Sequence, residues 1–197
     1  MSAITALIAI VVHEISHGFA AFLMGDTTAK RDGRLSLNPL NHIDWVGALC
    51  LMFFRIGWAK PVPVNPYMFK KRKLGIIFVS LAGVISNFML AVISIAILCA
   101  SSLYDISGII PVFFFRLALV NIGLGLFNLI PIPPLDGSKV LAEFLPLNLK
   151  LKYLQFERYG WILLFVLIYF GNLTKYLNVA LDFVLEGMFN LISGVIL

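Results

Sequence analysis

The chain has 197 residues, of which 60% are hydrophobic and 13% are charged, and its formal net charge is +5. This composition excludes an ordinary soluble domain and is typical of an integral membrane protein. The length allows about four to six membrane spans and no added soluble domain, so we expect a single membrane-embedded domain over residues 1–197. We attribute the positive charge to membrane topology, and we expect no nucleic-acid partner.

The first predicted element is an apolar helix over residues 2–24, and it contains His13-Glu14-x-x-His17. Positions i and i+4 lie on one face of a helix, so both imidazoles can bind one metal ion. Glu14 is one residue further along, where its carboxylate can take a proton from the attacking water. The alternative is a set of satisfied core residues. We disfavour it because ionisable groups in a membrane helix are costly without a functional partner.

The next predicted feature is a re-entrant or extended, β-like segment near residues 45–69. The apolar run Trp45–Trp58 is too short to span a membrane, which favours a re-entrant or interfacial placement. Three prolines in Pro61–Pro66 exclude a regular helix and favour an extended edge beside the metal. An extended edge can bind substrate as an added strand, so the candidate substrate-binding residues here are Val62, Val64 and Asn65. The alternative is an ordinary interfacial loop.

Two further apolar spans, over residues 74–100 and 109–128, are separated by a loop without Lys or Arg. Basic residues are concentrated in residues 25–73 and 139–158. The positive-inside rule therefore predicts that these two regions are cytoplasmic and that the N-terminus lies outside. His17 is eight residues before Gly25, so the metal would lie about 12 Å below the cytoplasmic membrane surface.

The C-terminal part, residues 153–197, contains a short apolar helix over 159–171 and a longer helix over 176–197. The longer helix carries one polar stripe, which either packs against the bundle or lies in the membrane interface. The stripe consists of Asn178, Asp182, Glu186, Asn190 and Ser193.

A catalytic zinc usually has three protein ligands and one open position, so one more ligand is needed. The best candidate is Asp136, which follows three prolines that unwind the end of the span over 109–128. Asn128 carries an amide donor that can stabilise a substrate carbonyl oxygen as it gains charge. Alternatively, Asp136 is a helix cap and Asn128 a helix-end amide.

Three motifs together resemble the site-2 protease family of intramembrane zinc metalloproteases. They are His13-Glu14-x-x-His17, Gly83-x-x-x-Asn87 and Asn128-x-x-Pro131-x-Pro133-x-Leu135-Asp136-Gly137. The resemblance is to the compact bacterial and archaeal branch and covers the chain through about residue 145, its core. It implies one Zn²⁺ per chain, held by His13, His17 and Asp136, with Glu14 as general base. Through its motif it adds Asn87 to the candidate substrate-binding residues.

The implied activity is hydrolysis of transmembrane segments in membrane protein substrates, by an all-α polytopic enzyme in a prokaryotic cytoplasmic membrane. The chain departs from many relatives in two ways: we expect no PDZ or CBS domain, because 197 residues leave no room for one, and Asp44 lacks the following proline. Two other functions remain open. One is a non-catalytic membrane binding protein with the protease fold, and the other is a metal or proton transporter. Oligomeric state is not predicted.

Overall fold

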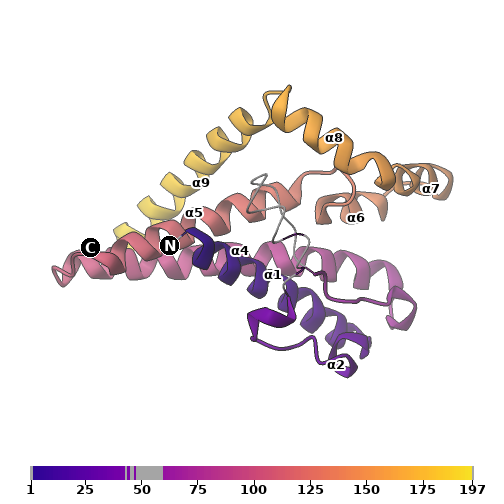
Figure 1. Ribbon diagram of the computed structural model, residues 1–197, viewed down its shortest axis with the longest axis horizontal. Helices are drawn as coiled ribbons and strands as arrows, with labels where there is room; N and C mark the ends of the chain where they lie inside the picture. The colour runs from indigo at the N-terminus through magenta and orange to yellow at the C-terminus, as the bar shows by residue number, and fades with distance from the viewer. Residues whose placement is uncertain (1, 43, 45–46, 48–59, 197) are drawn as a thin grey trace.

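The computed structural model describes residues 2–42, 44, 47 and 60–196 (Figure 1). Every regular element within these ranges is helical, and no β-strand is assigned there. The predicted all-α architecture is therefore confirmed. Except for Gly47, the apolar run Trp45–Trp58 falls outside the described residues, so its re-entrant placement stays a prediction.

Within the residues that the structure describes, four helices are long and apolar enough to cross a membrane. They are α1 (Ser2–Met24), α4 (Arg72–Leu103), α5 (Ile109–Leu129) and α9 (Leu173–Ile196). The predicted membrane bundle is confirmed. The shorter helices are α2 (Thr28–Arg31), α6 (Asp136–Ala142), α7 (Leu147–Gln155) and α8 (Glu157–Tyr169), with 3₁₀ turns η1 (Pro39–Asn41) and η2 (Pro66–Met68).

Helix α4 is the centre of the bundle, because α1, α5, α6 and α9 all pack against it. Its 32 residues make it roughly 48 Å long, which exceeds a hydrocarbon core of about 30 Å. Small residues on α1 allow close packing here: Ala20 and Ala21 form a buried cluster with Phe69 and with Val79 of α4. This close contact between α1 and α4 places the α1 histidines beside the middle of α4.

The last helix returns to the bundle after α8 has led the chain away from it (Figure 1). It packs on α4 and α5 through an apolar face, in which Leu185, Met188 and Ile192 contact a buried cluster of Ile95, Cys99 and Ala118. In the polar stripe, Asn178, Asp182, Glu186 and Asn190 are exposed. Of the two predicted placements, packing of the stripe against the bundle is therefore wrong. The apolar face packs instead because it buries area without desolvating charged groups.

Candidate metal centre

The two histidines of α1 point toward each other and toward Asp136 at the start of α6. The Nε2 atoms of His13 and His17 are 3.0 Å apart, and they lie 3.1 and 3.0 Å from Oδ2 of Asp136. The side chains are almost fully enclosed, with exposed fractions of 5% for His13, 9% for His17 and 5% for Asp136. The structure thus brings Asp136 to two potential ligands that lie more than 100 residues before it in the sequence.

Space for the two rings comes from Gly83 on α4. A Cβ atom at this position would lie 2.6 Å from Cε1 of His13 and 2.7 Å from Cε1 of His17. These distances are far below a normal carbon–carbon contact of about 3.5–4.0 Å. A side chain at residue 83 would therefore displace both imidazoles.

The hydrogen bonds made by the Nδ1 atoms of the two histidines fix their tautomers. Nδ1 of His17 is 2.7 Å from the carbonyl oxygen of Val79, which can only accept a hydrogen bond. Nδ1 of His13 is 2.6 Å from Oδ1 of Asn87. Both Nδ1 atoms therefore carry the proton, and both Nε2 atoms present a lone pair to the shared space.

The orientation of the Asn87 amide is itself set by its neighbours. Its Nδ2 donates to the carbonyl of Ala9 at 3.2 Å and to Oδ1 of Asn121 at 2.7 Å, which leaves Oδ1 facing His13. Asn121 in turn donates to the carbonyl of Leu117. Asn87 and Asn121 are both fully buried. A chain of oriented amides therefore runs from α5 through α4 to the first histidine.

Asp136 reaches the histidines because the chain turns sharply between α5 and α6. A Cβ on Gly137 would overlap the carbonyl oxygen of Leu129, so only glycine allows this close return of the backbone. Lys139, one helical turn further along α6, donates to Oδ1 of Asp136 at 2.9 Å. One carboxylate oxygen is thus engaged by the lysine, and the other faces the histidines.

These donors fit a divalent metal ion. Two imidazole nitrogens and one carboxylate oxygen lie within 4.8 Å of one another. With both protons on Nδ1, no hydrogen is available between the two Nε2 atoms. Lone pairs that face each other repel, and a cation between them removes that repulsion. Two histidines and one carboxylate are also a common donor set of catalytic zinc.

Glu14 lies beside the centre and contacts the segment that the prolines define. Its Oε2 accepts a hydrogen bond from the backbone N–H of Val62 at 2.8 Å. We call residues 60–70 the strap, because this segment runs along α1 from Glu14 to the end of the helix. The backbone N–H of Lys70 donates to the carbonyl of Met24, which ties down the far end of the strap.

A second carboxylate holds the middle of the strap. Asp26 is fully buried, and it accepts hydrogen bonds from the N–H of Asn65 at 2.6 Å and from Thr28. Burial alone would raise the pKa of Asp26, but these hydrogen bonds lower the pKa below its ordinary value. The strap is therefore anchored on α1 and the turn after it by two acidic side chains, Glu14 and Asp26.

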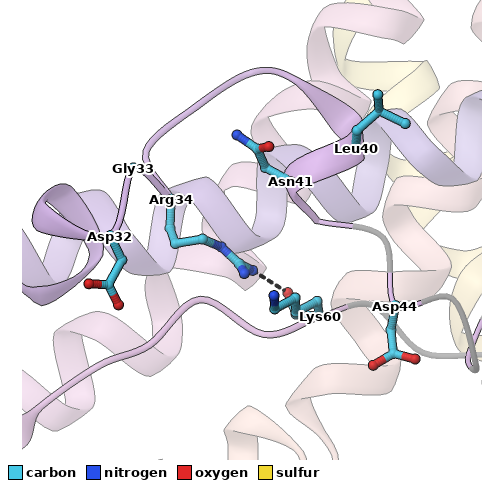
Figure 2. Close-up of a pocket in the computed structure, with 7 residues that line it drawn as sticks. All are labelled: Asp32, Gly33, Arg34, Leu40, Asn41, Asp44 and Lys60. Carbon is cyan, nitrogen blue, oxygen red and sulfur yellow. Dashed lines mark hydrogen bonds between the residues drawn. The ribbon is translucent and has the colours of Figure 1, made fainter.

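Arg34 holds the beginning of the strap, beside a polar pocket of about 420 Å³ (Figure 2). Its Nη2 donates to the carbonyls of Lys60 at 2.8 Å and Pro61 at 3.2 Å. The pocket contains none of the three potential metal ligands. Its lining consists of Asp32, Gly33, Arg34, Leu40, Asn41, Asp44 and Lys60.

The remaining sequence-predicted residues are placed as follows. Asn128 is half-buried at the end of α5, where its Nδ2 donates to the carbonyl of Leu124. Val62 is buried, and Val64 is half-buried. The backbone of Asn65 is extended, and its side chain caps η2 by accepting from the N–H of Tyr67. Asn87 contacts His13 rather than an open surface.

Comparison with known proteins identifies the family of the chain. The family model described as "Peptidase family M50" matches residues 103–171, which include Asn128 and Asp136. The chain is 38% identical over 170 residues to "Putative zinc metalloprotease YwhC" of Bacillus subtilis (strain 168), covering 83% of this chain and 78% of that protein. The chain belongs to peptidase family M50. The motif-based resemblance to site-2 proteases is thereby confirmed.

A second relative of this M50 protein is "Putative zinc metalloprotease Rip2" of Mycolicibacterium smegmatis (strain ATCC 700084 / mc(2)155). It is 28% identical over 180 residues, covering 86% of this chain and 67% of the relative. No solved structure matches the chain. Family membership and the four apolar helices make the M50 protein a metalloprotease integral to a membrane.

Sequence reasoning on this M50 protein missed three residues of the centre and its surroundings. Asn121 lies seven residues before Asn128, and that spacing places both on one face of α5. Lys139 follows Asp136 by three residues, so the two are neighbours on α6. Asp26 carried no such signal, because its partner Asn65 is 39 residues away in the sequence.

Proposed function

We propose that the chain is a site-2-type zinc endopeptidase that hydrolyses transmembrane segments of membrane protein substrates. The convergence of His13, His17 and Asp136, with both Nε2 lone pairs facing the carboxylate, carries the proposal. Zinc bound there would act as a Lewis acid, polarising the scissile carbonyl and making water a better nucleophile. We expect one Zn²⁺ per chain.

Each of the other residues takes a role that follows from its position. Glu14 accepts the proton of the attacking water and passes it to the departing amide nitrogen. The Val62 N–H holds the Glu14 carboxylate on the side of α1 where the strap lies. Asn128 keeps one amide hydrogen on its own helix and has a second amide hydrogen to offer a substrate oxygen.

The strap is the proposed site for an extended substrate. A helical substrate hides its carbonyls in internal hydrogen bonds, so the cleaved residues must unwind. The prolines at 61, 63 and 66 have no N–H, and the N–H groups of Val62 and Asn65 are bonded to acidic side chains. Among the described residues the N–H of Val64 has no bonded partner, so Val64 is the donor that we assign to substrate.

Two variants test the chemistry. We expect Glu14→Gln to bind zinc like the unchanged protein and to lose cleavage of a reporter transmembrane peptide, because Gln keeps the volume but accepts no proton. We expect Asp136→Ala to lose both zinc and cleavage. Metal analysis with peptide cleavage separates the alternatives. A binding protein would cleave nothing, a transporter would move metal without cleavage, and either result would contradict the proposal.

We also propose a single membrane-embedded domain with its core in residues 1–145 and C-terminal helices in 153–197. The distribution of Lys and Arg supports residues 25–73 in the cytoplasm, with the metal nearer that face of a prokaryotic cytoplasmic membrane. Labelling of Thr28→Cys and Ser102→Cys from the two sides tests this orientation. Modification of Thr28→Cys from outside only would invert it.

A further inference from the structure

An apolar groove runs between the end of α1 and the first half of α4, on the surface of the bundle. Its volume is about 510 Å³. Several of its side chains are well exposed, including Leu23 at 52%, Leu74 at 57% and Ile85 at 50%. The lining comprises Leu23, Met24, Lys70, Lys71, Leu74, Ile77, Phe78, Leu81 and Ile85.

Two lysines lie at one end of this otherwise apolar groove. Lys70 and Lys71 are exposed, and with the first two residues of α4 they form a run of four basic residues, Lys70–Lys73. The N-terminus of α4 at Arg72 adds the positive end of the helix dipole at the same place. The groove therefore has a cationic mouth and a hydrocarbon-like interior.

These lysines differ from the other cations nearby, which have partners. Arg72 lies over the ring of Tyr67 and Lys73 over the ring of Phe144, while Lys139 and Lys150 form ion pairs with Asp136 and Glu143. Within the described ranges, neither Lys70 nor Lys71 forms an ion pair or a ring contact. Their charges are therefore free to bind an anion from outside the protein.

The length of the groove matches one leaflet of a bilayer. Leu74 and Ile85 are eleven residues apart on α4, which corresponds to about 16 Å of helix. Half of a hydrocarbon core of about 30 Å is about 15 Å. An acyl chain that enters beside the lysines would therefore be covered to the middle of the membrane.

We propose that this groove binds one anionic phospholipid, with its phosphate at Lys70 and Lys71 and an acyl chain along Leu74, Phe78 and Ile85. Basic clusters next to membrane helices bind anionic headgroups at about 1 kcal/mol per residue. A transmembrane helix of another protein would fill the apolar part equally well but would not use the two unpaired charges. The proposal does not depend on peptidase activity.

Native mass spectrometry tests the site, with the purified full chain titrated with dioleoyl phosphatidylglycerol or dioleoyl phosphatidylcholine. We expect tighter binding of phosphatidylglycerol, and a loss of about 25-fold in that affinity in the Lys70→Gln/Lys71→Gln variant. Phosphatidylcholine binding should not change. The matched control is Lys152→Gln/Lys175→Gln, which removes the same charge at two exposed positions elsewhere. Equal affinity for the two lipids, or an equal loss in the control variant, would overturn the proposal.

A second measurement identifies the occupant. Benzoylphenylalanine placed at Phe78 should crosslink to an acyl chain in vesicles of three parts phosphatidylcholine to one part phosphatidylglycerol, and Lys70→Gln/Lys71→Gln should reduce the phosphatidylglycerol share of the product. Capture of a second polypeptide in place of lipid would show that the groove is a protein-docking surface and would overturn the proposal.

Discussion

Replacement of Asn87 is the most informative perturbation of the metal centre, because its oxygen selects the tautomer of His13. Substitution of a group that orients a metal ligand typically lowers metal affinity 10–100-fold, or about 1.4–2.7 kcal/mol. We expect a loss in this range for Asn87→Ala. The same change also removes two donated hydrogen bonds, to Ala9 and Asn121, so it destabilises the fold as well.

The variant Asn87→Asp separates the two effects. Its carboxylate still accepts from Nδ1 of His13 but donates to neither Ala9 nor Asn121, so stability falls as in Asn87→Ala. Zinc affinity should nevertheless stay at or above that of the unchanged protein, because a carboxylate on the distal nitrogen strengthens a histidine ligand.

Two measurements on each variant test whether Asn87 orients His13. One is the zinc affinity, measured by competition with a chelating dye, and the other is the thermal unfolding midpoint. Ser94→Ala is the control, since Ser94 is a fully buried polar residue of α4 that bonds only its own helix. Its zinc affinity should not change. If Asn87→Asp binds zinc as weakly as Asn87→Ala, or if Ser94→Ala also loses zinc, the orienting role of Asn87 is refuted.

Three further outcomes follow from the geometry. Asn128→Ala should keep zinc and lower kcat about 10²–10³-fold, which steady-state kinetics on a reporter peptide would measure. Gly83→Ala should abolish zinc binding by displacing His13, whereas Gly187→Ala, which has open space around it, should not. Because the folded-state pKa of Asp26 is lowered, its contribution to stability is complete above the ordinary pKa of about 3.9 and is lost as the pH falls toward the folded value. When the pH is lowered below about 4, the thermal unfolding midpoint of the unchanged protein should therefore fall, and that of Asp26→Asn should fall by less.

The grouping of the three potential metal ligands could be predicted from the sequence because each sits in a local pattern with a physical meaning. His13 and His17 share a helix face, and three prolines mark the unwound chain before Asp136. The amides that orient His13 were harder to predict. The bond between Asn87 and Asn121 joins two helices across 34 residues, and no local pattern specifies such a pairing. The role of Asn87 beside His13, rather than on a substrate surface, needed the packed structure.

The last helix shows a different limit of sequence reasoning. Its polar stripe and its apolar face are both regular, so helical periodicity alone left two placements. The choice depends on the surface that α4 and α5 offer, which is apolar around Ile95 and Ala118. Complementarity between distant elements decided this contact.

The proline pattern of the strap also affects whether copies of the protein can associate through this segment. Exposed extended segments usually present a row of N–H groups and invite pairing with other copies. In Pro61–Pro66, three residues have no N–H, and Glu14 and Asp26 occupy two more. Among the described residues this leaves the N–H of Val64. An edge with one available donor cannot support a continuous ladder between copies, so the segment resists self-assembly. The extended substrate that we propose would align on this edge in one register.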